Sequence, residues 1–122
     1  MRALKKGFTF IELLTVVVII GILATIAMSK FSKIKEESFV ASMKADLRNF
    51  AIYEMNYYID SRGLFFSGDG TAYGFTATPG VTISAVAVVG PPASWSATAT
   101  HSKTARACSM ITTGSNWDIS CP

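Results

Sequence analysis

Glu12 has the strongest sequence context for chemistry, because it lies inside an apolar run that extends from Phe8 to Met28. As a helix, these 21 residues would be about 32 Å long at 1.5 Å per residue, which matches the hydrocarbon core of a bilayer. A carboxylate inside a membrane-spanning segment is costly to desolvate and commonly has a functional role. We therefore expect Glu12 to have a cationic partner.

The two cysteines, Cys108 and Cys121, are the next candidates. A lone pair in a small exported domain indicates one disulfide and an oxidising compartment for residues 29–122. Closing a loop of about 14 residues contributes roughly 3 kcal/mol in the chain-entropy model. Metal binding is the weaker interpretation, because the spacing is not C-x-x-C and His101 would be a single further ligand. The sequence predicts no metal site and no cofactor.

The other polar residues form no recognisable catalytic pattern. His101 has no nucleophile and supporting acid in a known arrangement, and we interpret it as a surface turn residue. Gly68-Asp69-Gly70 lacks the second half of a P-loop or dinucleotide fingerprint and the clustered oxygen ligands of a calcium site, so it is interpreted as a turn. The sequence therefore predicts that the protein is not an enzyme.

The basic charge balance does not indicate a nucleic-acid partner. The formal net charge is +3, but three of the eleven basic residues lie before Gly7, which leaves eight basic and eight acidic residues in the rest of the chain. Lys103 and Arg106 near Trp95 are the only basic group considered for DNA uptake, and two residues are too few for an electrostatic footprint. Nucleic acid is not expected as a partner.

The junction between the basic leader and the apolar run carries the most specific motif. It reads Lys5-Lys6-Gly7 followed by Phe8-Thr9-Phe10-Ile11-Glu12-Leu13-Leu14, and it continues to Met28. This stretch resembles the class III signal of type IV pilins and type II secretion pseudopilins. The resemblance implies that a membrane prepilin peptidase cuts after Gly7 and methylates the new N-terminal residue, Phe8. It also implies that Glu12 pairs with the N-terminal amine of a neighbouring subunit.

The implied pairing of Glu12 is chemically reasonable. Cleavage creates an α-amine with a reference pKa near 8, and an unpaired charge beside apolar surface costs several kcal/mol. A glutamate at the same depth on an adjacent helix would neutralise it and set the axial register between subunits. The alternative is an inert anchor in which Glu12 only reaches the membrane interface, but an anchor has no need for an acid at this depth.

The end of the apolar run departs from the family pattern. Many members carry a proline shortly after this run, where the present chain has Ala27-Met28-Ser29. Serine retains its backbone N–H and does not kink a helix. The sequence therefore predicts a helix that continues through Ser29.

Beyond Ser29 the apolar residues recur in steps of three and four, which is typical of an amphipathic helix. One helix is predicted from about Phe8 to Tyr58, ended by Asp60-Ser61-Arg62-Gly63. Its apolar stripe comprises Val40, Met43, Leu47, Phe50, Ala51, Tyr57 and Tyr58.

The remaining residues predict strands and turns. Strand candidates are residues 81–86, 95–100, 106–112 and 117–121, with turns at 101–103 and 113–116. The predicted fold class is α+β, the pilin fold. In it, the first half of a long N-terminal helix spans the membrane and the second half packs on a small antiparallel sheet of three or four strands.

These elements predict a leader at residues 1–7, a transmembrane and assembly segment at 8–28, and an amphipathic half-helix with a β head at 29–122. The predicted function is that of a structural subunit of a type IV pilus filament. The precursor would be a single-pass inner-membrane prepilin, cleaved and N-methylated by prepilin peptidase. The inner-membrane assembly machinery would then polymerise it with other pilin subunits into an extracellular pilus on the cell surface.

Two alternatives are kept. A type II secretion pseudopilin would be periplasmic, and the cysteine pair favours a pilus because pseudopilins more often stabilise this region with calcium. A signal-anchored single-pass ligand-binding protein would keep Met1 or begin after residue 27. Adhesion, motility, DNA uptake and electron transfer all use this scaffold, and the head sequence does not choose among them.

Overall fold

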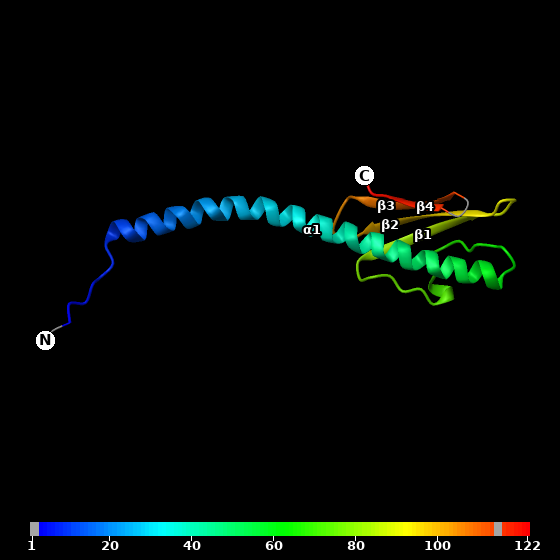
Figure 1. Cartoon of the computed structure of the whole chain (residues 1–122), viewed down its shortest axis with the longest axis horizontal. Coiled ribbons are helices and arrows are strands. Elements are labelled where there is room, and N and C mark those ends of the chain that lie inside the picture. The colour runs from blue at the N-terminus through cyan, green and yellow to red at the C-terminus, as the bar shows by residue number, and fades with distance from the viewer. Residues whose placement is uncertain (1–2, 114–115) are drawn as a thin grey trace. The chain divides into compact units, whose positions relative to one another are not determined.

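The structure, a computed structural model, describes residues 3–113 and 116–122 (Figure 1). The chain forms two compact units, which meet in sequence between Lys35 and Glu36. Its elements, in chain order, are α1 (Phe10–Asp60), the short 3₁₀ helix η1 (Thr71–Tyr73), β1 (Val81–Val88), β2 (Ser94–His101), β3 (Ala107–Thr113) and β4 (Asn116–Ser120).

The four strands form one antiparallel sheet in the order β1-β2-β3-β4, so each strand pairs with its neighbour in sequence. Ala99 at the centre of β2 lies opposite Ile83 of β1 and Cys108 of β3. Alternate residues of β1 and β2 are buried, as expected when one face of a sheet packs on a core and the other faces water. The alternating sequence that predicted β1 therefore reflects burial of one face.

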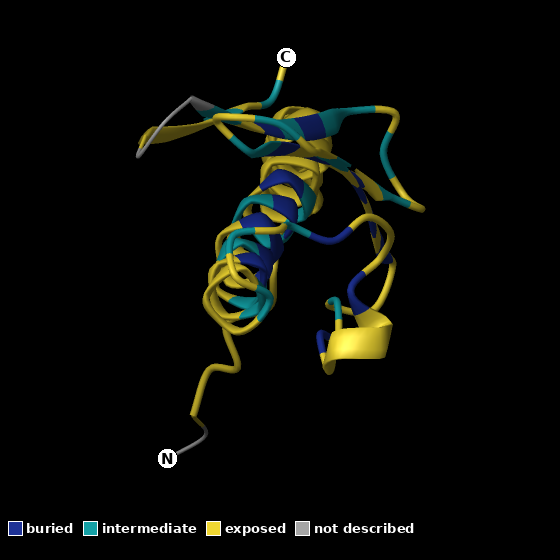
Figure 2. Ribbon diagram, turned by 90° about the vertical axis from the view of Figure 1, so that its right-hand side faces the viewer, coloured by how far each residue is buried: buried dark blue, intermediate teal, exposed yellow. Residues whose placement is uncertain are grey.

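The second half of α1 supplies the other layer of the core. Its buried apolar residues are Val40, Met43, Leu47 and Phe50, spaced three and four apart on one face. They pack with the inward residues of β1, β2 and β3 in one apolar cluster (Figure 2). The predicted α+β pilin fold, with a long N-terminal helix packed on an antiparallel sheet, is confirmed.

The element boundaries required correction. The helix predicted from Phe8 to Tyr58 is α1, Phe10–Asp60. Every strand candidate overlaps an observed strand, but the bounds differ. β1 continues to Val88, β3 begins at Ala107 rather than at Arg106, and β4 ends at Ser120, one residue before Cys121. The turn predicted at 113–116 includes residues 114 and 115, which lie outside the described residues, while Thr113 and Asn116 belong to strands.

Two side-chain predictions were wrong. His101 is the last residue of β2 rather than a turn residue, and its ring stacks on Phe39 of α1 with centroids 4.4 Å apart. Tyr58 is exposed and stacks on Phe65, whereas Tyr57 faces the core. Consecutive helical residues point about 100° apart, which here turns Tyr57 toward the core and Tyr58 toward the exposed side of α1.

Both predicted features of the α1 backbone are confirmed. The helix continues through Ser29, whose hydroxyl donates to the carbonyl oxygen of Ile26 at 3.0 Å. It ends in a left-handed turn, in which Gly63 has a φ of 97° and its N–H donates to the carbonyl of Tyr58 at 2.9 Å. Glycine adopts this conformation without steric cost, which explains the stop.

A disulfide joins Cys108 of β3 to Cys121 after β4. The Arg106 guanidinium lies nearby and donates to the Glu37 carboxylate at 2.8 Å and to the Pro122 carbonyl at 3.2 Å. The last residues of the chain are thus linked to both layers of the second unit, by one covalent bond and by hydrogen bonds from one side chain.

Two acids lie on the buried face of α1, which the apolar stripe did not predict. Both oxygens of Asp46 accept hydrogen bonds from Thr78, from its N–H at 2.7 Å and from its hydroxyl at 2.9 Å. Glu54 is completely buried, and its Oε2 accepts from the Phe66 N–H at 3.1 Å. The two carboxyls hold the loop between α1 and β1 against the helix, because they satisfy backbone donors that have no strand partner.

Glu54 is the more costly of these groups. Its Oε1 has no hydrogen-bond partner among the described residues. Burial raises the pKa of this carboxyl from the usual 4.5 to about 7, against the opposing effect of the Phe66 N–H. Between these two pH values the folded chain therefore keeps a proton that the unfolded chain releases.

This proton makes stability depend on pH. As pH rises from 4.5 to about 7, the free energy of unfolding should fall by an amount on the order of 3 kcal/mol and then level off. Thermal unfolding of the full chain in detergent micelles, followed by circular dichroism, measures this slope. Glu54→Gln should flatten it, because the amide stays neutral and keeps an acceptor for Phe66. The exposed control Asp60→Asn should leave the slope in place, and an unchanged slope in Glu54→Gln would contradict the assignment.

Candidate processing and assembly site at the start of the chain

The start of α1 is fixed by a reciprocal pair of contacts between Thr9 and Glu12. The Thr9 N–H and hydroxyl donate to Oε2 of Glu12 at 2.8 and 2.9 Å, and the Glu12 N–H donates to the Thr9 hydroxyl oxygen at 3.3 Å. This is a capping box, in which two side chains satisfy backbone donors that the first helical turn leaves free. It explains why α1 begins at Phe10, two residues later than predicted.

This cap was not predicted from the sequence, although its signal is present there. Thr9-Phe10-Ile11-Glu12 is the S/T-x-x-E pattern directly before an apolar run. Among the described residues, Oε1 of Glu12 makes no hydrogen bond, since both cap contacts use Oε2. One oxygen of the carboxylate therefore holds the helix start, and the other is free to accept from a second donor.

The residues before the cap have no regular structure. Residues 3–9 are exposed and belong to no helix or strand, and Phe8 is 85% exposed. A Cβ built at Gly7 would meet no atom within 4 Å. The Gly7–Phe8 peptide bond thus lies in an exposed segment just before a capped helix, where proteolytic cleavage is favoured.

The first part of α1 can cross a membrane by length and composition. Its most apolar window of 18 residues has a mean hydropathy of 2.6, and none of that window is buried by the rest of the chain. A helix that is apolar on all sides requires lipid or other helices around it. Glu12 lies in the first turn of α1, in a hollow lined by Phe8, Ile11, Thr15 and Val16.

The structure brings together only part of the predicted site. Glu12 contacts Thr9, whereas Gly7 and Phe8 make no hydrogen bond with it in the described residues. The cysteine pair belongs to the second unit and takes no part in this site. In residues 3–113 and 116–122, no group of three or more His, Cys, Asp or Glu side chains is placed to hold a metal ion.

Comparison with known proteins gives one match. Residues 2–28 match the family described as the prokaryotic N-terminal methylation motif. No curated protein and no solved structure matches the chain.

The matched residues cover the leader, the cap and the apolar run, and they confirm the resemblance to a class III signal. A motif of this type supports a type IV pilin or pseudopilin-like prepilin, and it implies processing by a prepilin peptidase. Together with the apolar start of α1, it fits a precursor anchored in the inner membrane.

Cleavage at Gly7 can be tested without disturbing the fold. Gly7→Val adds a branched side chain in open space, so α1 should be unaffected, while a peptidase that selects glycine should cleave the variant roughly tenfold more slowly or not at all. Intact mass and N-terminal sequencing after co-expression with a prepilin peptidase measure the outcome, and the unmodified chain should begin at methylated Phe8.

Ala3→Val is the matched control, because Ala3 lies in the same exposed leader. It should be processed normally. A mature chain that keeps Met1, or that begins after residue 27, would contradict the prepilin assignment and favour a signal-anchored protein.

Proposed function

We propose that this chain is a subunit of a type IV pilus filament, made as a single-pass prepilin of the inner membrane. Residues 1–7 are the leader, residues 8–28 are the membrane and assembly segment, and residues 29–122 are the amphipathic half-helix with its β head. The observation that carries this proposal is the methylation motif at residues 2–28, joined without a break to the capped apolar start of α1.

Cleavage after Gly7 and methylation of Phe8 would prepare the chain for assembly. The new amine at Phe8 is cationic at neutral pH, with a reference pKa near 8. Placed among packed apolar helices, such a charge costs several kcal/mol unless a carboxylate pairs with it. The free Oε1 of Glu12 offers that acceptor while Oε2 remains on the helix cap.

This arrangement supports pairing between copies. Phe8 lines the same hollow as Glu12, but residues 3–9 are not helical, so the new amine is not held in the helix and can also reach the Glu12 of an adjacent chain. A Glu12 on an adjacent helix at the same depth would neutralise the amine and define how far one subunit is displaced along the next.

The head fits display outside the cytoplasm. A disulfide between Cys108 and Cys121 is stable in an oxidising compartment, and both the periplasm and the cell exterior are oxidising. The disulfide favours a pilus over a periplasmic pseudopilus because pseudopilins more often stabilise this region with calcium. Filaments recovered from the cell surface, with this chain as their subunit, would separate the two.

Glu12 can be tested with a pair of substitutions. Glu12→Gln keeps the capping box, because glutamine serves at this position too, but removes the negative charge. Processing should be unchanged, while the yield of surface filaments seen by electron microscopy should fall roughly tenfold or more, because the amine stays unpaired. Glu12→Ala should lose the cap as well and assemble no better.

The control is Glu36→Gln, an acid on the same helix outside the apolar run. It should assemble normally. Normal filament yield from Glu12→Gln would show that charge pairing is not required and would remove the basis of the assembly mechanism.

A further inference from the structure

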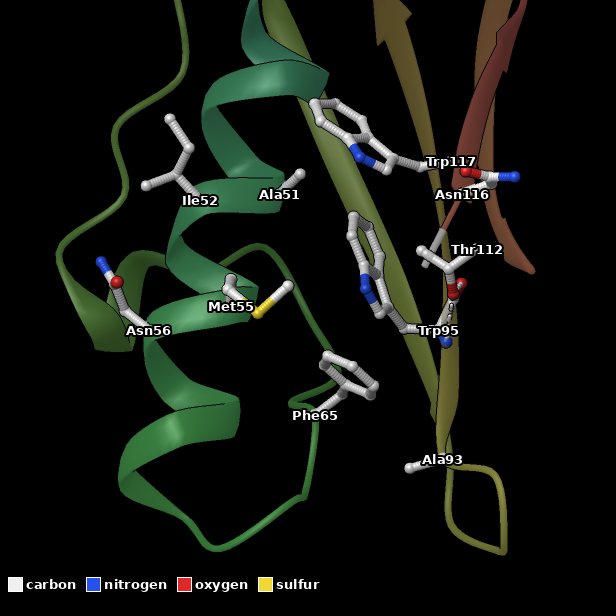
Figure 3. A pocket seen from close by; sticks show the side chains of 10 residues that line it. All are labelled: Ala51, Ile52, Met55, Asn56, Phe65, Ala93, Trp95, Thr112, Asn116 and Trp117. Carbon is white, nitrogen blue, oxygen red and sulfur yellow. Dashed lines mark hydrogen bonds between the residues drawn. The ribbon is translucent and has the colours of Figure 1, made fainter. Parts of the chain in front are cut away.

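The head carries an open apolar groove between the second half of α1 and the sheet (Figure 3). It has a volume of about 290 Å³. An apolar cavity of about 150 Å³ holds a benzene-sized group, so this groove has room for more than one aliphatic side chain. The residues that line it are Ala51, Ile52, Met55, Asn56, Phe65, Ala93, Trp95, Thr112, Asn116 and Trp117.

Three of the apolar side chains that line the groove are more than half exposed. Ile52 and Met55 of α1 are 58% and 56% exposed, and Trp117 of β4 is 51% exposed. Figure 3 shows Met55, Phe65 and the two tryptophans facing the space between helix and sheet, whereas the amide of Asn116 points away from it. Large apolar side chains gathered around a hollow mark an interaction site.

The polar groups of the groove are few and uncharged. The hydroxyl of Thr112 is already paired, since it accepts from the Trp95 N–H at 3.1 Å and donates to the Trp95 carbonyl at 2.8 Å. No lining residue carries a charge. The groove therefore suits an uncharged, apolar occupant, because a charged one would be desolvated without a partner.

The turn between β1 and β2 is an exposed, uncharged and apolar segment of the same head, similar in character to the groove. The turn between β1 and β2 reads Val89-Gly90-Pro91-Pro92-Ala93, without a charged residue. Val89 is 80% exposed, and Val86 and Val88 on the preceding strand are 58% and 56% exposed. Val88 with Ser94 is the last pair between β1 and β2, which places the tip at the end of the two strands, next to the groove that Ala93 helps to line.

We propose that the hairpin tip of one copy, residues 88–92, docks into the groove of the next copy. The inference rests on the proposed function, because it assigns a contact between heads in the same polymer. In the proposed contact each tip enters the groove of the next copy in one direction along the filament, which makes the contact heterologous and lets it repeat without closing. The contact needs little affinity by itself, since assembly through the apolar half of α1 would hold the heads at high local concentration.

A charge swap tests the contact in the assembled protein. Val89→Asp should lower the yield of surface filaments roughly tenfold, because its carboxylate would be buried in an uncharged groove. Met55→Lys should do the same from the other side. The double variant should recover filaments to within roughly twofold of the unmodified chain, since the two charges would then meet across the interface.

The control is Thr98→Asp, which adds the same charge to the exposed face of β2 and should assemble normally. Val89 and Met55 are both exposed, so the single variants should keep the circular dichroism and melting temperature of the unmodified full chain in micelles. Normal assembly of Val89→Asp, or no recovery in the double variant, would overturn the docking proposal.

A second measurement identifies the occupant directly. Val89→p-benzoylphenylalanine, irradiated in filaments mixed from isotopically light and heavy subunits, should cross-link between copies to Met55 or Trp117. Cross-links to lipid, to another protein or to a different surface of the head would overturn the contact. If the unmodified chain forms Glu12-dependent filaments but these cross-links are missing, only the head contact fails. If it forms no filaments, both proposals fail.

Discussion

One constraint dominates the structure: the first half of α1 is apolar, and no other part of the chain covers it. From Phe10 to Phe31 every residue of α1 is exposed, including a long succession of Ile, Leu and Val side chains. At roughly 25 cal/mol per Å² of apolar surface, such a segment is strongly disfavoured in water. The helix must therefore be surrounded by lipid or by other helices. In the second half of α1 the apolar face is removed from water within the chain, because from Val40 onward it packs against the sheet.

Within the head, polar anchors complete what apolar packing alone leaves open. The connection between α1 and β1 contains only the short helix η1, so most of its backbone donors have no regular partner. Asp46 binds Thr78, Glu54 binds Phe66, and Gly68 exchanges two backbone hydrogen bonds with Ala85 at the edge of β1. Unpaired backbone groups in this region would cost as much as lost hydrogen bonds. The connection is therefore ordered by a few specific acceptors.

The sequence predicted the features that arise from periodicity and failed where tertiary contacts decide. The helix, the antiparallel strands and the end of α1 at Gly63 follow from local patterns of burial and backbone conformation. The burial of Asp46 and Glu54 did not, because an acid on an apolar stripe is interpretable only once its partner in a distant loop is known. His101 was misplaced for the same reason, since Phe39 provides its ring with a packing surface.

At the start of the chain, the resemblance to a class III signal was predicted from sequence and is confirmed by the family match, but the cap that joins Glu12 to Thr9 was not predicted. The pattern is local, but a carboxylate in an apolar run also indicates a distant cation, and that expectation does not point to the donor three residues away, Thr9. The groove of the head was also not predictable from sequence. Its lining residues come from α1, from the loop after α1, from the turn before β2 and from β2, β3 and β4, which are separate in sequence.

The capping box gives the start of α1 an independence from what precedes it. Among the described residues, every hydrogen bond that holds the first turn comes from Thr9 or from residues after it, and none comes from residues 3–8. If cleavage follows Gly7 as proposed, removal of residues 1–7 would take away no hydrogen bond from the first turn. It would exchange a neutral peptide group for an ammonium group next to an intact cap, so maturation would change the charge at this end of the chain and leave the helix start in place.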